Sequence, residues 1–250
     1  MILAHALDAG AQAVAAVLAP SLGPRLTLLR PEWLGQARWS QRIDARGRAH
    51  TLLRWDGGHR LDGSQAGVVW NRIRMLPQAA FRVSAAPDRE YAGAELQALV
   101  ASWLAEMGAR VEPPMRRHAV VTPMLHQLHW AAAAGRCALA LAPAQPALAE
   151  DFSVLRTPIE LCGDVAAEWP APFMRACHAL AAELGFALLS LGFRGSPAAP
   201  LLCRVDAHPA LSSPRQVQAA ARWLRQRVDA ATYAAHAAHV RAPAAGEVLT

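Results

Sequence analysis

The chain has 250 residues, 54% of them hydrophobic, and a formal net charge of +6. All 25 of its Lys and Arg residues are arginine, so the chain contains no lysine. The absence of lysine excludes Schiff-base chemistry and a P-loop lysine on a nucleotide phosphate. Pro, Gly or Arg interrupts each apolar run before the roughly 20 residues of a membrane span, and the first ten residues lack the basic start of a secretory signal. These features predict a cytoplasmic protein without a membrane partner.

Two further functions are disfavoured by how particular residue types are distributed. The four cysteines are far apart and form no C-x-x-C motif, which predicts reduced thiols rather than a metal site. The arginines are spread along the chain, and their denser clusters at 42–48 and 222–227 have little aromatic interleaving beyond Trp223. A nucleic-acid partner is therefore not expected.

The N-terminal part predicts a parallel sheet. Residues 1–7 can form a strand, 8–18 an alanine-rich helix that Pro20 helps to end, and 25–29 a second strand, which is a βαβ pattern. The strand-like Thr51 to Leu53 precedes Asp56-Gly57-Gly58, a signal for a hairpin.

The stretch from Val68 to Gly108 carries the clearest secondary-structure pattern. A short apolar strand is followed by an arginine-rich turn and by a long helix that Pro87 suits as a start and Gly108 as an end. One apolar stripe is expected along that helix: Leu96, Leu99, Val100, Trp103, Leu104 and Met107. Residues 1–112 are therefore predicted to form an α/β domain.

The Pro113-Pro114 pair marks a break, and residues 113–241 are predicted to form a second domain before a tail at 242–250. A helix is expected at 123–134, and two short strands with a turn at 154–169. A helix from Pro172 to Gly185 leads into an antiparallel pair of strands at 186–193 and 201–207. A last helix begins after Ser213.

This order of elements resembles that of ATP-grasp proteins, in particular the bacterial branch near natural-product and peptide-modifying ligases. The segments VVWNRIRMLP and DREYAGAELQALVASWL are similar to that branch's V-x-x-R … Y-x-x-x-E … w-L block. The run from Pro172 to Pro209 resembles the closing helix, strand, loop and strand of the family. The resemblance implies an α/β fold with an N-terminal βαβ (pre-ATP-grasp-like) unit, followed by a reduced ATP-grasp-like α+β lobe with antiparallel strands.

The chain departs from that family where the chemistry lies. ATP-grasp ligases activate a carboxylate as an acyl phosphate, with lysines on the ATP phosphates and acidic residues of the last strands on magnesium. Here Arg204 stands where the magnesium-binding Glu is expected, Asp206 replaces an Asn, and Gly192 replaces an Asp. The segment between Ala134 and Val154 is also too short for the lid lobe. The resemblance therefore implies a degenerate, lid-less chain for which neither a metal nor ATP is expected as a cofactor.

Three residues are candidates for a catalytic role. Arg156 matches the arginine of the family's R-V-x-V-x-G strand, as the resemblance implies. Asp206 and His208 could form a general-base pair or a residual metal site, although polar residues at a strand end that face a loop are commoner.

Three arginines are candidates for binding substrate. Arg72 and Arg74 follow a strand at the carboxyl edge of the predicted sheet, where open α/β sheets bind ligands. Arg204 is the third. The alternative for Arg72 and Arg74 is that they lie on a solvated rim of the sheet or form an ion pair with Asp88 or Glu95.

Three functions remain open on the sequence alone. The first is a protein without ligase activity that serves as a partner or substrate-binding subunit in a biosynthetic pathway, and it is the one we expect. The second is an active ATP-dependent carboxylate–amine or carboxylate–thiol ligase, with ATP and magnesium, whose arginines replace the lysines. The third is a protein-interaction module whose alanine-rich helices form a homo-oligomer.

Overall fold

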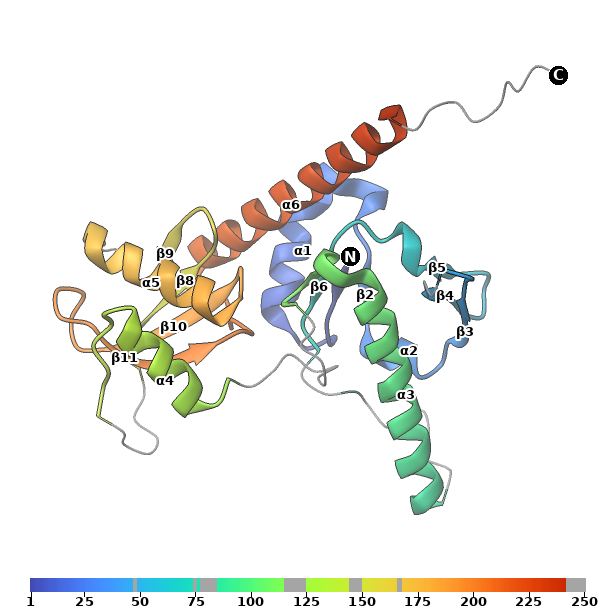
Figure 1. Ribbon diagram of the computed structural model, residues 1–250, viewed down its shortest axis with the longest axis horizontal. Helices are drawn as coiled ribbons and strands as arrows, with labels where there is room; N and C mark the ends of the chain where they lie inside the picture. The colour runs from blue at the N-terminus through green and yellow to red at the C-terminus, as the bar shows by residue number, and fades with distance from the viewer. Residues whose placement is uncertain are drawn as a thin grey trace.

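The computed structural model describes residues 1–46, 49–73, 76, 85–114, 125–143, 150–165 and 168–241. They form an N-terminal lobe and a C-terminal lobe, and the last helix, α6 (Pro214–Arg241), starts beside the C-terminal lobe and continues along the N-terminal one (Figure 1). Within these ranges, no helix is long and apolar enough to cross a bilayer.

The N-terminal lobe contains a parallel sheet in the order β2-β1-β6-β7. Its strands are β1 (Ile2–Leu3), β2 (Leu28–Leu29), β6 (Val69–Asn71) and β7 (Val111–Glu112). Its helices are α1 (Ala9–Leu22), α2 (Pro31–Leu34) and α3 (Ala86–Met107), with short 3₁₀ turns at Gly23–Arg25, Gly63–Gln65 and Gly108–Arg110. The predicted βαβ unit is confirmed, but α1 continues through Pro20 and ends at Gly23, whose φ of 49° suits a glycine.

Helix α3 covers the N-terminal sheet with the predicted stripe. Leu96, Val100, Trp103, Leu104 and Met107 are buried in one cluster, whereas Leu99 is only partly buried. A helix start next to Pro87 and an end at Gly108 are both confirmed.

A second, antiparallel sheet in this lobe has the order β3-β4-β5. Its strands are β3 (Arg38–Ile43), β4 (Ala49–Arg54) and β5 (Arg60–Asp62). The hairpin predicted at Asp56-Gly57-Gly58 joins β4 to β5. Strand β3 was not predicted, because its sequence RWSQRI is mostly polar.

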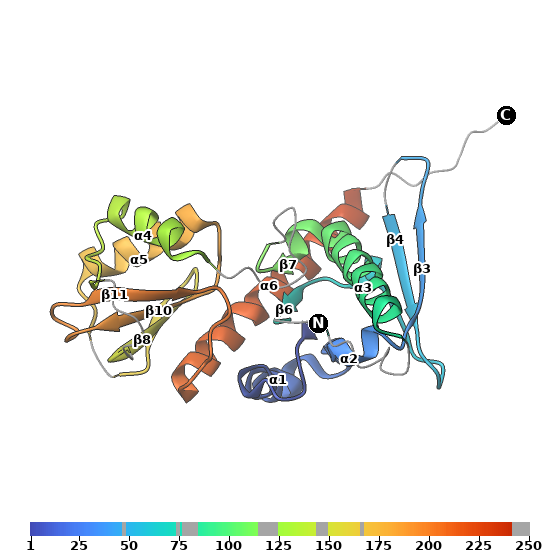
Figure 2. The same ribbon diagram turned by 90° about the horizontal axis from the view of Figure 1, so that it is seen from below.

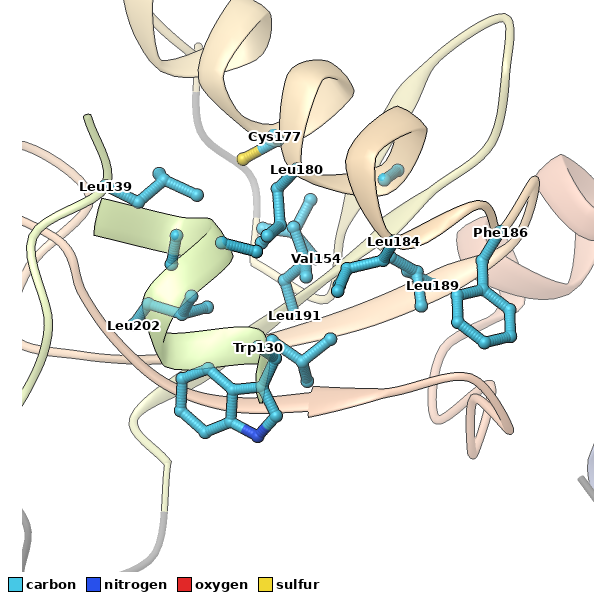
Figure 3. Close-up of a cluster of buried hydrophobic side chains, with 14 of the residues drawn as sticks. Trp130, Leu139, Val154, Cys177, Leu180, Leu184, Phe186, Leu189, Leu191 and Leu202 are labelled. Carbon is cyan, nitrogen blue, oxygen red and sulfur yellow. The ribbon is translucent and has the colours of Figure 1, made fainter. Parts of the chain in front are cut away.

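The C-terminal lobe is an antiparallel sheet covered on one face by two helices (Figure 2). Its strands, in the order β11-β10-β8-β9, are β8 (Phe152–Arg156), β9 (Leu161–Gly163), β10 (Leu189–Arg194) and β11 (Leu201–Asp206). The covering helices are α4 (Gln127–Arg136) and α5 (Ala171–Leu184). Figure 3 shows Leu180 and Leu184 of α5 lying against Leu189 and Leu191 of β10.

A third cluster of buried side chains joins the two lobes. It contains the facing surfaces of α1 and α6 together with Leu155 of β8 and Leu188, the residue before β10. The predicted boundary at 112/113 separates the two main sheets, while α6 packs on both sides of it. The chain is thus a mixed α/β protein with a parallel N-terminal sheet and an antiparallel C-terminal sheet, as predicted.

Candidate functional site

The face of the C-terminal sheet that is turned away from α4 and α5 is polar. In β10 the odd-numbered residues pack under the helices, so Ser190 and Gly192 face the other side. Their cross-strand partners on β11 are Asp206 and Arg204. Two of the predicted site residues therefore lie on this face, with a β-bulge immediately after Gly192.

An ion pair occupies the middle of this polar face. The Arg204 guanidinium donates to Glu150 Oε1 at 2.8 Å, and the Glu150 carboxylate lies directly over Gly192. A Cβ atom at position 192 would be 2.0 Å from Glu150 Oε2, which is far inside van der Waals contact. The absence of a side chain at Gly192 therefore creates the space that Glu150 fills.

The other carboxylates of the face are held by the protein's own donors. Asp164 accepts from the Ser153 amide at 2.9 and 3.0 Å and from its hydroxyl at 2.7 Å. Burial raises the pKa of Glu150, Asp164 and Asp206 raise it further, and Arg204 opposes them. In the part of the chain that the structure describes, no group of three or more His, Cys, Asp or Glu residues could hold a metal ion.

A buried polar cluster lies at the junction of the lobes, next to this face. The Arg72 side chain, 3% exposed, donates from Nε to Asp8 Oδ2 at 2.7 Å and from Nη2 to Asp8 Oδ1 at 3.0 Å and to the Pro209 carbonyl at 3.0 Å. It also stacks on the Trp70 ring. His208 Nε2 lies 3.7 Å from Asp8 Oδ2. The cluster therefore links the first helix, strand β6 and the segment after β11.

Asp8 has two tasks in this cluster. It caps helix α1 by accepting from the Ala11 amide at 2.9 Å, and it neutralises the buried Arg72. Burial raises the pKa of Asp8, but the hydrogen bond and charge of Arg72, the Ala11 amide and His208 outweigh it, so the pKa lies below its ordinary value. Asp8 is therefore ionised at neutral pH.

The predicted site residues fall into separate places. Arg72 and His208 come together around Asp8, and the Asp206 carboxylate accepts from the backbone amide of His208 at 2.8 Å. Arg72 is paired with Asp8 rather than with an acidic residue of α3. Arg74 lies outside the described residues.

Arg156 is buried on β8 and serves the packing of the lobe. Its guanidinium donates to the carbonyls of Phe186 and Ala187 at 3.2 and 3.0 Å, and to Nδ1 of His178 at 3.1 Å. Burial lowers the pKa of Arg156 and also that of His178, whose ring accepts this hydrogen bond. The described contacts of Arg156 tie α5 and the segment that follows it to β8.

The sequence did not single out Asp8 or Glu150 as site residues. Asp8 stands directly before an alanine-rich helix, where an N-cap is expected, and that signal could have drawn attention to it. Glu150 follows a proline-rich loop and has no local signal. Its role depends on Gly192 and Arg204, which are distant in the chain.

The fold of the chain is similar to that of ATP-grasp ligases, as the resemblance implied. No protein-family model matches the sequence, and no curated protein matches it. The macrocyclase MdnC from Microcystis aeruginosa MRC, bound with precursor peptide MdnA, is similar with a TM-score of 0.65 and 9% identity, over 90% of this chain and 98% of that one.

Two further ATP-grasp ligases have similar structures. PsnB, complexed with minimal precursor, Mg and ADP, has a TM-score of 0.63 and 12% identity, over 91% of this chain and 97% of that one. A Chryseobacterium gregarium RiPP-associated ligase, in complex with ADP and a leader and core peptide, has a TM-score of 0.61 and 9% identity, over 93% of this chain and 95% of that one. At these identities the likeness is one of fold.

Proposed function

We propose that this chain is an ATP-grasp-fold protein without magnesium–ATP ligase chemistry, and that it binds a precursor peptide as a partner subunit in a peptide-modifying pathway. The observation that carries the proposal is the Arg204–Glu150 ion pair over Gly192. It fills the place where the family resemblance calls for magnesium ligands.

The donors around that pair do not fit a magnesium ion. Magnesium requires several hard oxygen ligands in a near-octahedral arrangement. Arg204 brings a positive charge onto the face and engages Glu150. Asp164 already accepts three hydrogen bonds from Ser153. The lack of lysine removes the usual partners of the ATP phosphates as well.

The peptide part of the proposal rests on the solved structures that share the fold. MdnC, PsnB and the Chryseobacterium ligase were each crystallised with a precursor peptide or with its leader and core. The buried packing of the N-terminal lobe is intact here, with α3 and β6 as the resemblance implied. A scaffold that is kept without the metal ligands is consistent with binding rather than ligation.

Thermal unfolding with and without magnesium and ATP tests the proposal. A true ligand at 100 times its Kd would stabilise the protein by about 2.7 kcal/mol, whereas we expect no change in Tm up to millimolar concentrations. Stabilisation by magnesium–ATP would contradict the proposal and favour the active-ligase alternative.

The double variant Gly192→Asp/Arg204→Glu is a useful comparison for this assay. It removes the guanidinium that holds Glu150, so that this side chain can leave the space over position 192, and it places two carboxylates on the same face of β10 and β11. If magnesium raises the Tm of this variant but not that of the wild type, residues 192 and 204 are the reason that the wild-type protein does not respond.

A further inference from the structure

A row of arginines crosses the small β3-β4-β5 sheet. Arg38 of β3 lies opposite Arg54 of β4, and Arg54 lies opposite Arg60 of β5. Directly opposed residues share one face of a sheet, and neighbouring strands are about 5 Å apart. Arg42 lies on the same face of β3, four residues beyond Arg38. Like charges in this arrangement repel each other, so the row is unfavourable unless an anion lies on it.

The charges of this row are largely unneutralised. Within the described ranges, the side chains of Arg42, Arg54 and Arg60 make no hydrogen bond or ion pair, and Asp62 of β5 is the acidic residue that shares their face of the strands. Arg38 approaches Asp56 at 3.9 Å, with the two side chains 87% and 100% exposed. The buried and junction arginines behave differently, since Arg72, Arg156 and Arg204 each have close partners.

A groove of about 630 Å³ runs along the same part of the sheet. It is lined by Arg38, Trp39, Ser40, Arg42, Arg54, Trp55, Asp56, Gly57 and Gly58. The indole N–H groups of Trp39 and Trp55 donate to the carbonyls of Leu34 and Trp33 at 2.9 and 2.7 Å. These bonds hold the two rings against the core on the opposite face of the sheet, so the arginine face rests on a fixed backbone.

Strand β3 is also an edge strand. It pairs only with β4 among the described strands, so its other side presents backbone groups to which an extended chain can add. Alternate side chains of an added strand would lie beside Arg38, Ser40 and Arg42. Figures 1 and 2 place this sheet at the end of the N-terminal lobe that points away from the C-terminal lobe.

We propose that β3 docks an extended acidic peptide segment with carboxylates at alternate positions, which face Arg38 and Arg42 of β3 and lie within reach of Arg54 on the neighbouring strand. Main-chain pairing with β3 supplies register, and the guanidinium groups select carboxylates, which they can bind in a bidentate manner. The inference rests on the proposed function in so far as the chain binds a peptide. It further specifies the surface that binds the peptide and the acidic character of the bound segment.

Fluorescence anisotropy with the full chain tests this docking. The probe is a labelled peptide of about ten residues with glutamate at every second position, compared with its glutamine counterpart and with a peptide of the same composition whose glutamates are contiguous. We expect the alternating peptide to bind best, and its affinity to fall as salt is added. Equal binding of the alternating and contiguous peptides would overturn the strand-addition geometry.

Matched variants locate the site. Arg38→Ala/Arg42→Ala/Arg54→Ala should weaken binding about tenfold, since exposed ion pairs are individually weak but add up. The corresponding lysine variant keeps the charge but loses the bidentate geometry, so it should recover only part of the affinity. Arg25→Ala/Arg175→Ala/Arg215→Ala removes the same charge from exposed positions elsewhere and should bind like the wild type. An equal loss in that control, or tighter binding of single-stranded DNA at the same arginines, would overturn the proposal.

The outcomes for the two proposals are separable. If magnesium–ATP stabilises the protein while the acidic peptide still binds through the arginine row, the proposed function fails and this inference stands. If magnesium–ATP has no effect and the alanine variant binds the peptide as tightly as the wild type, the inference fails. The same is true if the wild-type protein does not bind the peptide at millimolar concentration.

Discussion

Arg72 and Asp8 form a two-bond ion pair across 64 residues of sequence, with Nε–Oδ2 and Nη2–Oδ1 distances of 2.7 and 3.0 Å. The pair is almost fully buried, and Arg72 also reaches the Pro209 carbonyl behind β11. Gly10 makes this approach possible, because a Cβ there would be 2.9 Å from the Ala210 carbonyl oxygen. This charge pair lies within the N-terminal lobe, and its added bond to the Pro209 carbonyl fixes where the first helix and the segment after β11 meet.

Replacing Asp8 by alanine should destabilise the protein strongly. The change leaves a buried guanidinium without its carboxylate and removes the N-cap of α1, and together these should cost about 4 kcal/mol. Urea unfolding followed by circular dichroism measures the loss. Asp8→Asn separates the two effects, because asparagine caps a helix as well as aspartate but cannot neutralise Arg72.

The control for this prediction is Asp56→Ala. Asp56 faces Arg38 at 3.9 Å with both side chains exposed, and its removal should leave the unfolding midpoint unchanged. If Asp8→Asn is as stable as the wild type, the ion pair contributes no net stability and the helix cap alone is important.

Local signals in the sequence were sufficient for much of the fold. The apolar stripe of α3, the glycines that end α3 and α5, and the proline at the start of α6 each depend on residues within a few positions of one another. The site contacts are different in kind. Glu150 meets Arg204 across 54 residues, and Arg72 meets Asp8 across 64, so no spacing or motif could pair them.

Strand β3 illustrates the same limit for secondary structure. It alternates arginine with tryptophan and polar residues, and only Trp39 contributes to a core, by packing edge-on against Trp103. Its pairing with β4 and the cover provided by α3 define the strand. A polar sequence of this kind resembles a loop until its neighbours are known.

Arg156 should matter for stability rather than for binding a ligand. Replacing it by alanine leaves the carbonyls of Phe186 and Ala187 without their donor in a buried position, which should cost about 3 kcal/mol. Lysine should recover only part of this, because it lacks the planar fork that reaches three acceptors. Thermal unfolding is the measurement, and Arg175→Ala on the exposed side of α5 is the control that should show no change. An Arg156→Ala protein of wild-type stability would contradict the structural role.

Glu112 should make stability fall as pH rises. Burial raises its pKa, and the amides of Ala187 and Leu188 and the charges of Arg227 and Arg156 oppose the shift without cancelling it. The folded protein therefore holds the Glu112 proton more tightly than the unfolded chain does, above the ordinary pKa of 4.5. Its contribution to stability is full below that value and is lost as pH rises through the folded pKa.

The variant Glu112→Gln isolates this effect, because glutamine resembles the protonated form and does not titrate. The stability of the wild type relative to Glu112→Gln should decrease as pH rises above 4.5, as measured by urea midpoints at successive pH values. A difference that grows with pH would show that Arg227 and the two amides determine the pKa instead.

Gly192 and Glu150 should be energetically coupled. In the wild type, Gly192→Ala pushes a methyl group to 2.0 Å from Glu150 Oε2 and displaces the carboxylate from Arg204, which should cost about 1 kcal/mol. In a Glu150→Ala background the nearest obstacle is gone and the Arg204 Cβ remains at 3.2 Å, so the same change should cost less. Urea unfolding of the four proteins gives the coupling free energy, which we expect to be about 1 kcal/mol. Additive effects would mean that Glu150 does not occupy the space over Gly192, and the main support for a face without magnesium ligands would be lost.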